Sequence, residues 1–452
     1  MNSTAKNIIV TLLSAMIYMI FALYDNYPVV TSDTGAYIDI GYTLVPPADR
    51  PILYGLFIRA TSLGASLWLT SFAQCVILAY VVNSFIRGMV PRIFNRHLLA
   101  VNIVISLGTI AGWYVGQIMP DIFVSVMVLC IVQYFLFSNS KAKNIILLLI
   151  AFLAIVVHNS NYVIITLFVT GLFILSIFFK DLKVFRGKAI TLLAIGIVAW
   201  LTLCFSNLIG GKGFSAGSAT HVFVMGKLNE SGVLKTYLDK ACADNQYKIC
   251  AYKDKLPPVA WEFHWDASSP VQQTGGWDAN RQEYNAIIKD ICSRPKYWPF
   301  LAYKSLEATA RQLSLTNIDG SYSLPWTKFD EESSPYKMIA KYYPHELNEF
   351  KMSRQNTKTF NIPLYNNIYV IVIILSSIAV LLFVNPWTRE MKLVYLSTIA
   401  LIVLNAFTTA TLSSVNERLN SRVIWLLPFL NLLFIFRAAY LRYTIHKKSE
   451  LN

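Results

Sequence analysis

Charged side chains are scarce in this chain. Only 14% of its 452 residues are Asp, Glu, Lys or Arg, whereas 55% are hydrophobic. Soluble domains usually carry about 25% charged residues, so the composition excludes a chain that folds around one soluble core. It indicates a protein that lies mostly within a lipid bilayer.

Several motifs of well-known chemistry are also missing. The sequence contains no P-loop and no H-E-x-x-H motif. Its six cysteines have neither C-x-x-C nor Cys/His spacing, which argues against a zinc site. Cys242 and Cys250 could form a short-loop disulfide in an oxidising compartment, while a Cys250–Cys292 bridge or no bridge at all remain open.

Ten apolar stretches are present instead, and together they predict an all-α polytopic membrane protein with about ten transmembrane helices. The stretches are 8–24, 66–86, 98–114, 122–137, 145–157, 162–179, 189–207, 367–385, 393–411 and 423–440. The first is longer than a typical signal-peptide core and no small-x-small site follows it, so we expect a retained span.

The polar stretch between the seventh and eighth apolar runs predicts a mainly helical extracytoplasmic domain, inserted before the last three spans. Within it, the apolar spacing at 281–292 and 299–315 is typical of helices. The predicted organisation is a transmembrane module at 1–207, an extracytoplasmic domain at 208–366 and a second transmembrane module at 367–452.

The basic residues orient the chain. With both termini in the cytoplasm, the inward connections and tails carry sixteen Lys and Arg against three Asp and Glu, as the positive-inside rule requires. This excess explains most of the net charge of +14. It predicts contact with anionic membrane lipids and no nucleic-acid partner.

The predicted spans hold essentially no ionisable side chain apart from Arg437 near an inner end. Ion-coupled transporters usually keep such residues near the middle of the membrane. The charges gather at the outer ends of the spans, which favours work at the outer boundary of the membrane.

Four clusters at these outer ends are candidates for a functional site. Each also has a structural interpretation: a solvated acidic loop, a helix N-cap, a hydrogen-bonded structural histidine and a charged surface. In chain order, the clusters are Asp33 with Tyr37, Asp49 and Arg50; Asp121; His158; and Arg418 with Arg422.

The membrane part, about two-thirds of the chain, resembles the GT-C superfamily of bacterial membrane glycosyltransferases. The resemblance lies in Asp33 within an S-D-x-x-x-Y setting, in Arg50-Pro51 followed by an amphipathic segment, in Pro120-Asp121, and in Arg422 before a last span that contains Pro428. The family often has a second acidic residue beside the first; here Asp33 stands alone, so a divalent metal is compatible with the site but not required by the sequence.

The resemblance implies an inverting transfer of a sugar from a polyprenyl-phosphate donor to a glycan, lipid or protein acceptor, at the outer face of the bacterial inner membrane. Asp33 would be the catalytic base, and Asp121 would orient the acceptor or a metal. Arg50 and Arg422 would bind the donor phosphate. Further candidates for the cleft are Tyr37, His158, Arg418, Trp265 and Asp266.

Two other functions remain open. The chain could transport or flip a lipid-linked saccharide, although the uncharged spans argue against this. It could also be a non-catalytic assembly or receptor protein whose extracytoplasmic domain binds a partner.

Overall fold

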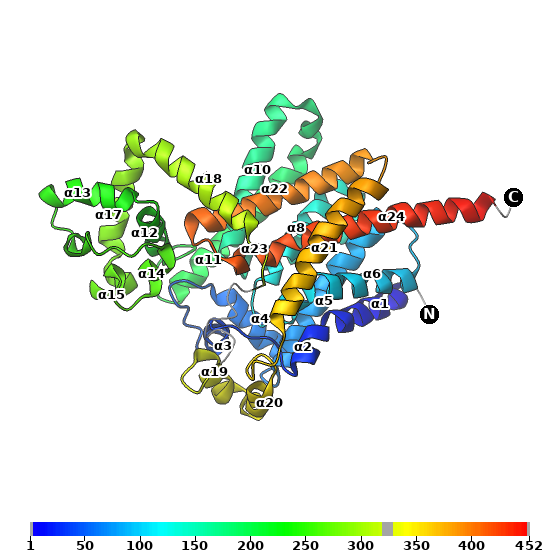
Figure 1. Cartoon of the computed structure of the whole chain (residues 1–452), viewed down its shortest axis with the longest axis horizontal. Coiled ribbons are helices and arrows are strands. Elements are labelled where there is room, and N and C mark those ends of the chain that lie inside the picture. The colour runs from blue at the N-terminus through cyan, green and yellow to red at the C-terminus, as the bar shows by residue number, and fades with distance from the viewer. Residues whose placement is uncertain (1–2, 319–328, 450–452) are drawn as a thin grey trace.

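The computed structural model describes residues 3–318 and 329–449, and within these ranges the chain is helical (Figure 1). No strand forms among the described residues; β pairing is limited to an isolated parallel bridge between Val29 and Gln117. The all-α class predicted from the sequence is therefore confirmed.

The helices before the polar segment begin and end as follows: α1 Ser3–Tyr18, α2 Ile20–Asp25, α3 Thr34–Thr43, α4 Ile52–Ser62, α5 Leu67–Met89, α6 Asn95–Gly108, α7 Ala111–Gly116, α8 Ile122–Leu136, α9 Lys141–Val156, α10 Ser160–Phe178, η1 Lys180–Phe185 and α11 Arg186–Ile209.

The polar segment contains α12 Thr220–Glu230, α13 Val233–Asp244, η2 Lys248–Tyr252, α14 Ala260–Trp265, α15 Pro270–Gln273, α16 Gly276–Ala279, α17 Arg281–Ser293, η3 Pro295–Tyr297, α18 Trp298–Ser314, α19 Ser334–Tyr342, η5 Pro344–Glu346 and α20 Leu347–Met352. The last four helices are α21 Ile362–Phe383, α22 Arg389–Leu412, α23 Glu417–Ile424 and α24 Leu426–Ser449.

Seven segments are helical, long and apolar enough to cross a membrane, which is consistent with a multi-pass membrane protein. They are Thr4–Asp25, Leu67–Met89, Ser160–Phe178, Lys180–Ile209, Ile362–Phe383, Arg389–Leu412 and Glu417–Tyr443. The count of about ten is not confirmed, because three predicted spans coincide with short helices, α6, α8 and α9. The longest of these, α9, has 16 residues and extends about 24 Å, less than the ~30 Å hydrocarbon layer.

The most apolar of the short helices, α8, lies inside the protein. Every residue from Ile122 to Phe135 is buried, and α8 runs through the centre of the bundle in Figure 1. An apolar run of this length is as typical of a buried core helix as of a span, and here neighbouring helices surround it.

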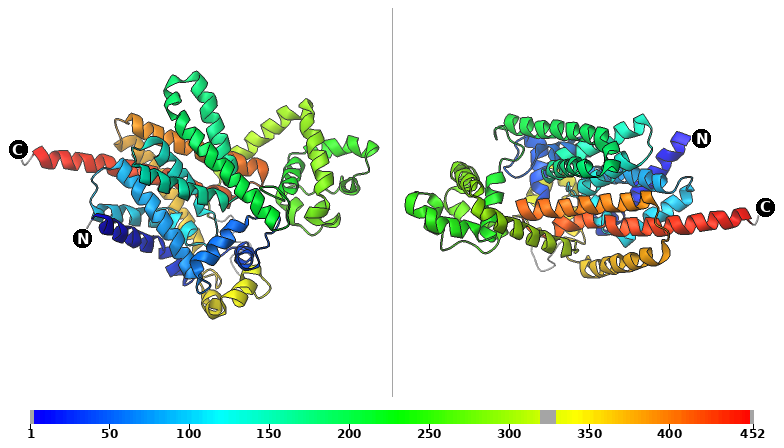
Figure 2. Two further views of the ribbon diagram at one scale, coloured as in Figure 1. Left: turned by 180° about the vertical axis from the view of Figure 1, so that it is seen from behind. Right: turned by 90° about the horizontal axis from the view of Figure 1, so that it is seen from above.

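The two termini lie at one end of the bundle, and the green helices α12–α17 lie at the opposite end (Figures 1 and 2). Ion pairs tie the helix ends on the side of the termini: Arg389 to Asp181 at 2.9 Å and Arg437 to Glu390 at 3.2 Å. The side of the membrane that each end faces stays a prediction.

The polar segment packs in two parts. Residues 220–301, here called the lobe, have their own apolar core, which includes Tyr237 and Phe263, and they contain the Cys242–Cys250 disulfide. Helices α17 and α18 match the two helices expected there. Residues 329–360 instead pack on the membrane helices, where Tyr343 and Phe350 join the main core.

Labelling of cysteines tests this arrangement of the two ends. Cys292 is exposed on the lobe, and the other free cysteines are buried. Lys183, at the opposite end, is exposed. We expect a membrane-impermeant maleimide to modify Cys292 in intact cells, but to modify Cys292→Ser/Lys183→Cys only after permeabilisation. Labelling of both from the same side would contradict the arrangement.

Candidate functional site

Charged residues from three of the four clusters, together with His158 of the remaining one, meet in one network at the lobe end of the bundle. Asp33 precedes α3, Arg50 lies in the loop before α4, Asp121 precedes α8, and Arg418 and Arg422 lie on α23. Carboxylates and guanidinium groups alternate along it, in the order Asp49, Arg50, Asp33, Arg418, Asp121 and Arg422. Three negative and three positive charges therefore balance.

The outer part of this network is partly exposed to solvent. The Asp33 carboxylate accepts a hydrogen bond of 2.5 Å from Arg50 Nη2 and bonds of 3.1 and 3.0 Å from Arg418 Nη1 and Nη2. The side chains of Asp33, Arg50 and Arg418 are 22%, 18% and 23% exposed. Each of the three side chains therefore keeps part of its surface accessible to solvent.

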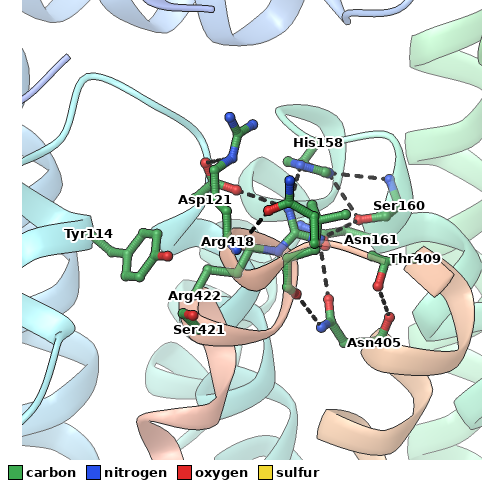
Figure 3. A network of polar contacts seen from close by, with 12 residues as sticks. Tyr114, Asp121, His158, Ser160, Asn161, Asn405, Thr409, Arg418, Ser421 and Arg422 are labelled. Atoms are coloured by element: carbon green, nitrogen blue, oxygen red, sulfur yellow. Dashed lines mark hydrogen bonds and ion pairs between the residues drawn. The ribbon is translucent and has the colours of Figure 1, made fainter. Parts of the chain in front are cut away.

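The inner part is sealed. Asp121 and Arg422 are 0% exposed and form an ion pair of 3.0 Å, and Arg418 Nε lies 3.2 Å from the other Asp121 oxygen. Figure 3 shows Asp121 beside both arginines. Arg418 thus contacts both carboxylates and connects the outer part to the sealed part.

The local sequence of α23 explains this arrangement. The Asn416 side chain caps the helix by accepting a hydrogen bond of 2.9 Å from the Arg418 N–H. Arg418 and Arg422 then follow at a spacing of four residues, which puts them on the same face, where like charges repel. Asp121 lies between the two guanidinium groups and offsets that repulsion.

His158 and two other polar groups complete the surroundings of Arg422. Its Nη1 donates to His158 Nε2 at 2.7 Å, and its Nη2 donates to Asn405 Oδ1 at 3.2 Å and Ser160 Oγ at 3.3 Å (Figure 3). Because an arginine can only donate, Nε2 accepts this bond, while Nδ1 lies 2.9 Å from Ser160 Oγ and 3.3 Å from the Ser160 backbone nitrogen.

Burial and the arginines set the charge states of the site. Burial alone would raise the pKa of both Asp33 and Asp121, but the nearby arginines, Arg418 foremost, hold each pKa below its ordinary value. Burial, and then the charge of Arg422, lower the pKa of His158 to about 3. At neutral pH both carboxylates are ionised and the His158 ring is neutral.

The other predicted cleft residues divide between the site and the lobe. Tyr37 belongs to the site, since the Arg50 guanidinium lies 5.8 Å from its ring centre. Trp265 and Asp266 make their contacts within the lobe: Trp265 packs against Trp277, and the Asp266 carboxylate accepts two hydrogen bonds from Ser268.

Two polar residues of the site, Asn405 and Ser125, were not predicted from the sequence. Asn405 contacts Arg422, and Ser125 Oγ donates a hydrogen bond of 2.6 Å to the Arg422 carbonyl oxygen. Asn405 is an amide side chain within the apolar helix α22, and this is the sequence feature that could have marked it as a site residue.

No cluster of three or more His, Cys, Asp or Glu residues with the geometry to hold a metal ion occurs in the described ranges 3–318 and 329–449. Asp33 and Asp121 each pair with two guanidinium groups instead, with which a cation would have to compete. No known protein family, no curated protein and no solved structure matches this chain.

Removal of the sealed carboxylate tests the inner ion pair. Asp121→Asn leaves the buried Arg422 charge uncompensated, which typically costs ~3–5 kcal/mol, so we expect a clear drop in the unfolding temperature of the purified protein. Asp181→Asn is the matched control, because its pair with Arg389 is exposed and such pairs contribute little. Equal effects of the two variants would contradict the assignment.

The low pKa of His158 predicts how its ring behaves with pH. The folded protein binds the proton more weakly than the unfolded chain, so this histidine stabilises the fold fully above about pH 6.5 and progressively less as the pH falls toward 3. In ¹⁵N-histidine NMR, with His158→Gln to assign the signal, we expect a neutral ring that does not titrate between pH 5 and 8. A midpoint in that interval would contradict the geometry.

Proposed function

We propose that this chain transfers a sugar from a polyprenyl-phosphate donor to an acceptor hydroxyl at the outer face of a bacterial inner membrane. The observation that supports this is the partly exposed Asp33 carboxylate between the guanidinium groups of Arg50 and Arg418. A base and two phosphate-binding cations lie side by side there, which is what displacement of a phosphate by a hydroxyl needs.

The position of the site agrees with this proposal. Two segments that connect the lobe to the helices contact loops of the site: Ser218 Oγ donates to the Ala48 carbonyl at 2.8 Å, and the Gln312 side chain pairs with the Asn416 backbone at 2.6 and 3.0 Å. A donor whose lipid tail lies among the helices would therefore present its phosphate and sugar beneath the lobe.

The donor phosphate is assigned to Arg50 and Arg418. The sequence favoured Arg50 and Arg422, but Arg422 is fully buried and its terminal nitrogens already donate to Asp121, His158, Ser160 and Asn405. In this proposal Arg422 and Asp121 are positioning residues, which hold Arg418 in place from behind.

Asp33 acts as the base only after the donor has bound. With two guanidinium groups against it, the pKa of Asp33 is below its usual value, which makes the carboxylate a weak base. A donor phosphate competes for the same two arginines, and as their pull on Asp33 weakens its basicity rises. Donor binding therefore prepares the base.

The reaction is then a single displacement. The acceptor oxygen attacks the anomeric carbon while Asp33 takes the hydroxyl proton, and the bond to the phosphate oxygen breaks to release polyprenyl phosphate. One displacement inverts the anomeric configuration. The acceptor is a surface glycan, a lipid or a protein.

The positions of charges in the candidate spans argue against the alternative, ion-coupled transport of a lipid-linked saccharide. The Asp, Glu, Lys and Arg residues of those seven segments lie near their ends. Transport driven by ions usually depends on such groups at the centre of the membrane.

Substitution of the base gives the decisive test. Asp33→Asn keeps the shape of the side chain but removes the proton acceptor, so we expect transfer to fall by about 10²–10⁴-fold, the usual contribution of general base catalysis. The measurement is release of polyprenyl phosphate and formation of glycosylated product by membranes supplied with lipid-linked sugars. Asp39→Asn, on the helix α3 that follows Asp33, is the control, because Asp39 pairs with Lys341 outside the network.

Binding separates loss of chemistry from loss of folding. Asp33→Asn removes the carboxylate that competes for Arg50 and Arg418, so the variant should bind polyprenyl phosphate at least as tightly as the wild type. Full activity in Asp33→Asn would refute the proposed base. Transport of a lipid-linked saccharide that survives this substitution would favour the alternative function.

A further inference from the structure

A second polar hollow lies away from the Asp33 network, where the chain leaves α11 and enters the lobe. It has a volume of about 410 Å³ and is lined by the loop 211–215 together with Asp278 and Arg281 of the lobe. Gly211 and Gly213 have φ angles of +75° and +81°, a conformation that favours glycine and lets the short loop curve around the hollow.

The hollow carries a net positive charge. Asp278 is the one carboxylate of its lining, and it is shared by two cations, Arg281 at 2.7 Å and Lys212 at 3.6 Å. Ser215 also lines the hollow, and its Oγ is buried and has no hydrogen-bond partner among the described residues. A surplus cation beside an unused hydroxyl is suited to an anion with several acceptor oxygens.

The hollow also lies next to an apolar helix face. Phe214 packs against Phe205 and Trp200 of α11 at ring-centre distances of 5.3 and 5.9 Å, and all three rings are exposed. The loop is held there because the Lys212 N–H donates to the Asn207 carbonyl at 2.8 Å and the Asn207 side chain donates to the Ser215 carbonyl at 2.7 Å.

This geometry places the cations at the end of a candidate membrane span, Lys180–Ile209. Aromatic rings gather at the boundary between hydrocarbon and headgroups, and Phe214, two residues after Lys212, forms such a group with Phe205 and Trp200. The hollow thus combines cations near the end of a candidate span with an apolar helix face along α11.

Residues 213–217 also spell G-x-S-x-G, the pattern of a hydrolase nucleophile. That motif requires a turn between a strand and a helix, with a base beside the serine. Here it lies in a loop after a helix, and within residues 3–318 and 329–449 no base is hydrogen-bonded to Ser215 Oγ. The hollow is therefore interpreted as a binding site.

We propose that this hollow binds the phosphate of an anionic membrane phospholipid, with Lys212, Arg281 and Ser215 Oγ on the phosphate oxygens and an acyl chain beside Phe214 along α11. The proposal is independent of glycosyl transfer, because none of these residues belongs to the Asp33 network. The bound lipid would fix the lobe relative to the membrane surface.

Native mass spectrometry of the full-length protein, purified in detergent with added phosphatidylglycerol, tests this site. We expect Lys212→Gln/Arg281→Gln to retain at least about fivefold less phosphatidylglycerol than the wild type, as loss of two cations near a headgroup implies. Lys235→Gln/Arg294→Gln is the matched control, because it removes a Lys and an Arg that pair with other carboxylates of the lobe, and it should retain lipid like the wild type.

Asp278→Asn should increase the retention of phosphatidylglycerol, because it releases Lys212 and Arg281 from their shared carboxylate. Wild-type retention in Lys212→Gln/Arg281→Gln, or equal loss in the two double variants, would overturn the proposal. Displacement of the lipid by millimolar inorganic phosphate would also overturn it, because the acyl chain would then contribute nothing. Unchanged unfolding temperatures establish that the variants are folded.

Discussion

The ion pairs of the buried Asp121 carboxylate hold this site together. A fully buried carboxylate is costly unless charged hydrogen-bond donors surround it, and Asp121 meets Arg422 at 3.0 Å and Arg418 at 3.2 Å. These contacts join the start of α8 to α23, two elements about 300 residues apart in sequence. Once Arg418 is fixed from behind in this way, its other nitrogens point toward Asp33.

The network contains two kinds of ion pair: buried pairs that hold the structure together and partly exposed pairs that can exchange with a ligand. Its inner half is saturated: Arg422 is enclosed by Asp121, His158, Ser160 and Asn405. Its outer half is partly exposed, and there Asp33 shares Arg50 and Arg418. An incoming anion can exchange with the outer pairs, whereas the inner pairs have no access to solvent. A rigid half and an exchangeable half are what a site needs to bind a charged ligand without losing its shape.

Much of the fold could be predicted because a membrane restricts the choices. Apolar runs in this setting must be helical, and each of the ten predicted runs does contain a helix. Length was harder to judge from apolarity alone. The run that became α8 is buried by its neighbours, and a helix packed against protein is as apolar as one packed against lipid. The segment 329–360 is held against the loop between α2 and α3, because Glu346 and Gln355 bond to Tyr27 and Val30, and no local pattern predicts these contacts.

The sequence by itself determined that the chain is helical, that its charges lie at helix ends, and that Asp33, Arg50, Asp121, His158, Arg418 and Arg422 are the residues to consider. Those features follow from composition and spacing, which are local. Only the tertiary structure decided which arginine is saturated and which is accessible, and that Trp265 and Asp266 make their contacts within the lobe. Burial and pairing depend on contacts between segments hundreds of residues apart, and no local pattern encodes those contacts.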